Sequence, residues 1–191
     1  MEFLTEAEGL IKAKDRVKES LKRYPLLATY ADPLEFVFYA FYIQGGHVIY
    51  QDHMKSSEFN PVPLNGRRVA NLVIGAKDRK DTIDIIWSVF HEWGHLSQLP
   101  QTEEIRLNQQ LTYYRESEAW DIAEIKLREY PTILPFIDKF YVYRDFCLND
   151  YKKRFLNKAD IKGTQGHSPP RPGIPGRLDQ SMLLDNPATP I

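Results

Sequence analysis

The sequence has one cysteine, no long apolar run and no marked excess of charge of either sign. A single cysteine, Cys147, excludes an intrachain disulfide framework and is typical of a reducing compartment. Phe146 and Leu148 flank it, so we expect a buried structural thiol there rather than a nucleophile. No segment approaches the ~20 consecutive apolar residues of a membrane span. Because the net charge is −1 and no basic stripe occurs, we expect no direct nucleic-acid partner. The single cysteine and the lack of a membrane span together predict a cytoplasmic protein without a membrane partner.

The two ends of the chain differ from its middle. The N-terminus is acidic and lacks the basic and apolar regions of a secretory signal peptide, so none is predicted. From residue 162 onward, prolines and glycines crowd a stretch without hydrophobic period, which predicts an extended or disordered tail. We therefore expect one domain at 1–161, beginning with a helix, and a tail at 162–191.

Hydrophobic periodicity predicts an α+β domain, mostly helical with a short β-sheet beside the central helix. The predicted helices lie at about 5–23, 34–43, from Asp81 or Thr82 to near Pro100, 111–130 and 132–156. The first begins at a capping box of Thr5 and Glu8, and the second has Asp32 as its N-cap. The predicted strands lie at 47–52 and 68–75. Residues 54–66 contain two prolines and an Asn-Gly pair, which predict a loop.

The most informative stretch is His91-Glu92-Trp93-Gly94-His95, which contains the pattern His-Glu-x-x-His. It follows an apolar run at helical spacing, so we expect it on a buried helix. Residues four apart lie on one helical face, and His91 and His95 can therefore direct their imidazoles to one point. Two neutral imidazoles suit Zn²⁺. The pattern thus predicts a zinc site.

Two other residues of the motif support this interpretation. Glu92 lies about 100° round the helix from His91, where its carboxylate can reach a metal-bound water and act as general base. Gly94 lies in the middle of the helix, where Gly costs about 1 kcal/mol relative to Ala. We therefore expect another backbone to pack closely against Gly94.

A catalytic zinc takes three protein ligands and keeps one position open. The pattern that supplies a third histidine downstream requires Gly and His where this chain has Gln98 and Gln101. The remaining candidates are Glu116 and Glu118 on the next predicted helix. They differ by about 200° round that helix, but its apolar face lies between them. Angle alone therefore does not choose the third ligand.

The histidine motif followed by Glu118-Ala119-x-x-Ile122-Ala123 resembles the ImmA/IrrE-type metallopeptidases, a family of small gluzincin-like zinc enzymes. The resemblance extends loosely back to residue 33, and it does not cover residues 1–30 or the tail. The chain departs from the common form at Ile122, where an aromatic residue is typical. It also lacks the helix-turn-helix domain that is often fused to this family.

The resemblance implies a zincin-like fold and assigns roles to individual residues. Zinc is expected on His91, His95 and Glu118, with Glu92 as the catalytic base. Asp121 is expected to orient one of the histidines from outside the ligand shell. Glu116 and Glu124 are then expected on the solvated face of their helix.

The expected function is that of a zinc-dependent metallopeptidase that hydrolyses peptide bonds of an intracellular protein. An extended substrate would lie along an edge strand beside the motif helix, for which 69–74 is the candidate. The candidates for a tyrosine that stabilises the oxyanion are Tyr113, Tyr114, Tyr141 and Tyr143. The alternative is a catalytically inactive, zinc-stabilised protein-interaction module. The presence of Glu92 favours the enzyme, because a structural zinc site has no use for that carboxylate.

Overall fold

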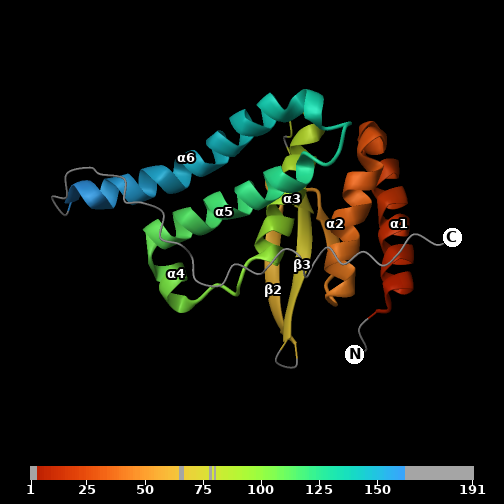
Figure 1. The fold of residues 1–191 in the computed structure, drawn as a ribbon, viewed down its shortest axis with the longest axis horizontal. Helices are drawn as coiled ribbons and strands as arrows, with labels where there is room; N and C mark the ends of the chain where they lie inside the picture. The colour runs from red at the N-terminus through yellow and green to blue at the C-terminus, as the bar shows by residue number, and fades with distance from the viewer. Residues whose placement is uncertain (1–3, 65–66, 78, 80, 162–191) are drawn as a thin grey trace.

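A computed structural model describes residues 4–64, 67–77, 79 and 81–161 (Figure 1). The helices are α1 Glu6–Arg23, η1 Pro25–Tyr30, α2 Ala31–Ile43, α3 Ile83–Ser97, α4 Glu103–Leu107, α5 Gln109–Leu127, η2 Leu134–Phe136 and α6 Ile137–Ile161. The strands are β1 Val48–Gln51, β2 Glu58–Leu64 and β3 Arg67–Gly75. The predicted α+β class is confirmed, and the predicted tail at 162–191 lies outside the described residues. Within the described part, no helix is both long and apolar enough to cross a membrane.

The start of the chain follows local signals closely. The Thr5 hydroxyl accepts the Glu8 N–H at 3.3 Å, and the Glu8 carboxylate accepts the Thr5 N–H at 2.8 Å, which confirms the capping box. The predicted N-cap at Asp32 is wrong. The short helix η1 leads directly into α2, so Tyr30 takes the N-cap position and Asp32 lies in the first turn. Gly45, which follows the C-cap residue of α2, has a φ of 80°, a conformation that glycine adopts without strain.

The sheet has the order β1-β3-β2, with β1 parallel and β2 antiparallel to β3. The loop predicted at 54–66 is wrong, because its second half forms β2. Pro61 pairs with Ala70 of β3 but has no N–H to donate, so its nitrogen must face away from β3. Pro63, two residues on, has the same orientation. Both prolines are therefore tolerated because β2 is an edge strand.

This strand order also corrects the expected substrate strand. Residues 69–74 belong to β3, which is paired on both sides and has no free edge. The strand with a free edge beside α3 is β2, whose Phe59 ring lies 6.1 Å from the His95 ring.

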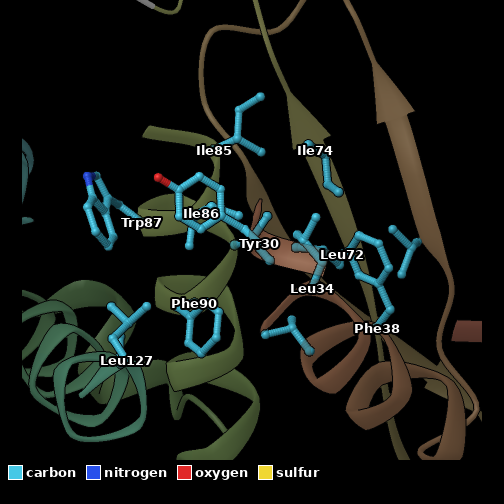
Figure 2. Packing of buried hydrophobic residues seen from close by; sticks show 14 of the residues in the cluster. Tyr30, Leu34, Phe38, Leu72, Ile74, Ile85, Ile86, Trp87, Phe90 and Leu127 are labelled. Carbon is cyan, nitrogen blue, oxygen red and sulfur yellow. The ribbon is translucent and has the colours of Figure 1, made fainter. Parts of the chain in front are cut away.

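Helix α3 occupies the centre of the molecule and is buried along most of its length. Helices α1 and α2 lie on one side of it, and α5 and α6 on the other (Figure 1). Figure 2 shows Phe90 of α3 between Leu127 of α5 and the α2 residues Leu34 and Phe38. This position brings the motif between the sheet and α5.

The close backbone approach predicted at Gly94 is confirmed. A Cβ atom added to Gly94 would lie 2.3 Å from the carbonyl oxygen of Ala119 in α5. Helices α3 and α5 therefore cross in backbone contact at this point, which decides which face of α5 meets the histidines.

Candidate metal centre

The two histidines of the motif share one face of α3, as their spacing predicts. Their ring centroids are 4.6 Å apart, and each residue is 8% exposed. Both Nε2 atoms approach the same oxygen of α5. Oε2 of Glu116 lies 3.2 Å from Nε2 of His91 and 3.3 Å from Nε2 of His95.

These distances fit a metal ion. Zinc–ligand bonds of 2.0–2.1 Å in a tetrahedron place neighbouring ligand atoms about 3.3 Å apart. The distances from the Glu116 oxygen to the two imidazole nitrogens have this value. Donor atoms of His91, Glu92 and His95 also lie within 4.8 Å of one another. Of the two carboxylates, Glu116 is the better third ligand, because it contacts both nitrogens whereas Glu92 also accepts a backbone N–H.

Glu118, the ligand that the family resemblance implies, points elsewhere. Its Oε2 accepts a hydrogen bond at 2.9 Å from Nε2 of Gln98. The crossing at Gly94 places Ala119 against α3, and Glu116 lies one turn before Ala119 on the same face of α5. Glu118 is about 100° away from Ala119. The geometry therefore places Glu116, and not Glu118, beside the two histidines.

A signal for Glu116 was present in the sequence but was missed. Glu116, Trp120, Ala123 and Leu127 follow the spacing i, i+4, i+7 and i+11, which marks one helical face. The last three of these residues are buried. The predicted face included Ile122, which is only half-buried, and it lay between the two glutamates. The choice of Glu118 therefore came from the family resemblance.

Different contacts orient the two imidazoles. The His91 ring stacks on Trp120, with centroids 4.1 Å apart and planes inclined by 19°. His95 Nδ1 hydrogen-bonds Oε1 of Gln98 at 2.9 Å. Asp121, expected to orient a histidine, instead accepts a 2.7 Å hydrogen bond from Arg144 of α6. Neither Trp120 nor Gln98 was predicted as a residue of the site.

The charges of the site are tightly coupled. Burial, and then the charge of His95, lower the pKa of His91 to about 4, so this imidazole is neutral. Burial is the largest single effect and opposes charge on both His95 and Glu116. The hydrogen bonds and opposite charges around these groups together outweigh burial, so the pKa of His95 is raised and that of Glu116 is lowered. A proton is thus held between His95 and Glu116. A divalent cation offers the same donor atoms a stronger positive charge.

Glu92 lies beside the histidines and is almost fully buried. Burial raises its pKa to about 8, the negative charge of Glu116 adds to this effect, and the charge of His95 opposes it. The backbone N–H of Phe59 in β2 donates to its carboxylate. A carboxylate whose pKa lies near neutrality can both accept and return a proton, as a general base must.

The tyrosines predicted for the oxyanion mostly bond other partners. The hydroxyl of Tyr114 hydrogen-bonds Gln110, that of Tyr141 hydrogen-bonds Glu124, and that of Tyr143 hydrogen-bonds Arg79. Tyr151 of α6 instead lies near the site. Burial raises its pKa to about 12, and the charges of Glu116 and Glu92 contribute. From the sequence, Tyr151 was predicted to be a core aromatic residue. Glu124, expected on a solvated face, is half-buried between α5 and α6.

Cys147 is half-buried rather than buried, since Leu148 faces the core while Phe146 is 77% exposed. Burial raises the pKa of its thiol from 9.0 to about 11.

At pH 7.5, we expect Cys147 in the folded protein to react with iodoacetamide about 100-fold more slowly than in the urea-unfolded chain. A pKa two units higher lowers the fraction of reactive thiolate by about that factor. Mass spectrometry of the alkylated protein over time measures both rates. Because the chain has one cysteine, the total label reports this thiol alone. Equal rates in the two states would contradict the burial of the thiol.

Comparisons with protein families, curated proteins and solved structures find no match to this chain. The resemblance to ImmA/IrrE-type metallopeptidases therefore stays a prediction from two short motifs.

Proposed function

We propose that this protein is a zinc-dependent metallopeptidase of zincin-like fold, similar to the ImmA/IrrE type, that hydrolyses peptide bonds of an intracellular protein. His91, His95 and Glu116 hold the zinc ion, and Glu92 is the general base. The observation that carries the proposal is the contact of one Glu116 oxygen with both imidazole nitrogens, at the spacing of tetrahedral zinc ligands.

The chemistry divides between the metal and the chain. Bound zinc supplies Lewis acidity, which lowers the pKa of a coordinated water and polarises the scissile carbonyl. Glu92 takes the proton of the attacking water and passes it to the leaving amine. The Phe59 N–H holds the Glu92 carboxylate in place for both transfers. Trp120 and Gln98 keep the imidazoles of His91 and His95 oriented.

An extended substrate fits beside the outer edge of β2. At this edge the Phe59 N–H is already bonded to Glu92, and Pro61 and Pro63 have no N–H. The carbonyl groups of Pro61 and Pro63 face away from β3, as their nitrogens do. The edge therefore presents acceptors, and a peptide aligned with β2 would bind it mainly by donating its own N–H groups.

Metal analysis tests the proposal. We expect protein purified without chelator to contain about one zinc ion per chain, and Glu116→Ala to lose most of it. Since binding to the folded state adds about 4.1 kcal/mol at a free ligand concentration of 1,000 Kd, a strong chelator should lower the Tm of the wild type but not of the variant. Plasma mass spectrometry and thermal unfolding measure these effects.

Glu104→Ala, on the exposed face of α4, is the matched control and should keep its zinc. The proposal fails if the wild type contains no metal and its Tm is indifferent to chelator.

A further inference from the structure

We infer that Gln98 and Glu118 form a relay that positions His95 for metal binding, with Glu118 acting through Gln98 rather than as a ligand. The inference rests on the proposed zinc site and extends it beyond the three ligands. It gives a role to the carboxylate of Glu118, which contacts Gln98 instead of the two histidines.

The relay is a short chain of hydrogen bonds between α3 and α5. Gln98, the residue that follows α3, is buried. Its Nε2 donates to the backbone carbonyl of Arg115 at 2.8 Å and to Oε2 of Glu118 at 2.9 Å. Its Oε1 lies 2.9 Å from Nδ1 of His95.

These contacts determine the orientation of the Gln98 amide. An amide nitrogen has two N–H donors, and both are used by the acceptors of Arg115 and Glu118. The reversed amide would place its oxygen against a carbonyl and a carboxylate, which repel it. Oε1 must therefore face His95, where it can only accept.

The orientation of the amide selects the tautomer of His95. Since Oε1 only accepts, Nδ1 of His95 must carry a proton and donate it. When the ring is neutral, the lone pair then lies on Nε2, the atom that faces Glu116. This is the tautomer that can ligate a metal at that position.

The charge of Glu118 strengthens the effect. A carboxylate that accepts from the amide N–H polarises the amide and makes its oxygen a better acceptor. That acceptor in turn makes the imidazole of His95 a stronger donor of its Nε2 lone pair. His91 has no such support, because among the described residues its buried Nδ1 has no hydrogen-bond partner. The relay therefore acts on one histidine alone.

The test measures zinc affinity by competition with a chromophoric chelator. We expect Gln98→Met, which keeps the chain length but removes the amide, and Glu118→Ala each to bind zinc about 10–100-fold more weakly than the wild type. The double variant should bind no more weakly than Gln98→Met alone, because Glu118 acts only through the amide. Glu103→Ala, on the exposed face of α4, should retain wild-type affinity.

A second measurement reports the tautomer directly. In ¹⁵N-labelled, zinc-loaded protein, the wild type should show a protected Nδ1–H resonance for His95. This resonance should exchange rapidly with water in Gln98→Met and in Glu118→Ala. If Gln98→Met does not fold, as judged by its unfolding transition in chelator, Glu118→Gln carries the test. It should lower affinity less than Glu118→Ala does, since it keeps an acceptor without the charge.

Two results would overturn the relay while leaving the zinc site standing. One is wild-type affinity in Glu118→Ala. The other is a further large loss when Glu118→Ala is added to Gln98→Met, which would make Glu118 itself a ligand. A wild-type protein that binds no zinc would instead overturn the proposed function, and the relay with it.

Discussion

Glu92→Gln should lower peptide hydrolysis by about 10²–10⁴-fold, the usual contribution of a general base. Glutamine has the shape and hydrogen-bonding reach of glutamate but cannot accept the proton of the attacking water at neutral pH. Because Glu92 is not among the proposed ligands, zinc content should stay at the wild-type level. The Tm of the variant should not fall. Burial raises the pKa of Glu92 to about 8, and the substitution replaces this buried acid with a neutral group of the same size.

The measurement compares cleavage of a peptide library by the zinc-loaded wild type and by Glu92→Gln, with products identified by mass spectrometry. Glu103→Gln, on the exposed surface of α4, is the control and should cleave as the wild type does. A variant that retains full activity would exclude Glu92 as the base. If neither wild type nor variant cleaves any peptide while both bind zinc, the catalytically inactive, zinc-stabilised interaction module becomes the better account.

Gly94→Ala should destabilise the protein by about 2 kcal/mol, and zinc affinity should fall with it. The new Cβ would lie 2.3 Å from the Ala119 carbonyl oxygen, and this backbone atom can move only if α5 moves as a whole. Such overpacking costs about 1–3 kcal/mol and occasionally more, and a clash with a backbone atom belongs at the upper end of that range. The better helix propensity of alanine offsets about 1 kcal/mol of this cost. Moving α5 also moves Glu116 away from the histidines.

Gly9→Ala is the matched control, since Gly9 is also a buried glycine within a helix. Its added Cβ would lie 2.7 Å from Cγ2 of Ile43, the end of a side chain that can rotate away. We expect its stability to stay within about 1 kcal/mol of the wild type. Urea unfolding compares the free energies of both variants. Equal effects at the two positions would show that the crossing of α3 and α5 is not the cause.

Local sequence signals were sufficient where the deciding contacts are local. The capping box of Thr5 and Glu8 joins residues three apart, and the structure has it as predicted. His91 and His95 share a face because they are four apart on one helix, whatever packs against them. The cost of Gly94 within a helix likewise predicted a neighbouring backbone, although it did not say which one.

Strand β2 shows where local reasoning fails. Two prolines and a nearby Asn-Gly pair are typical of a loop, and they led to that prediction for 54–66. The prolines are compatible with a strand because β2 lies at the edge of the sheet, with their nitrogens turned away from β3. Edge position depends on the strand order, which no local pattern contains.

The sequence by itself determined the donor types of the candidate site, the helix that carries the two histidines and the carboxylate beside them. Only the tertiary structure decided that Glu116 faces the histidines while Glu118 faces Gln98. Both glutamates lie on the same helix but about 200° apart, so the rotation of α5 about its axis decides which of them meets the histidines. That rotation is set by the contact of Gly94 with Ala119, between residues 25 positions apart whose meeting depends on how the whole core packs.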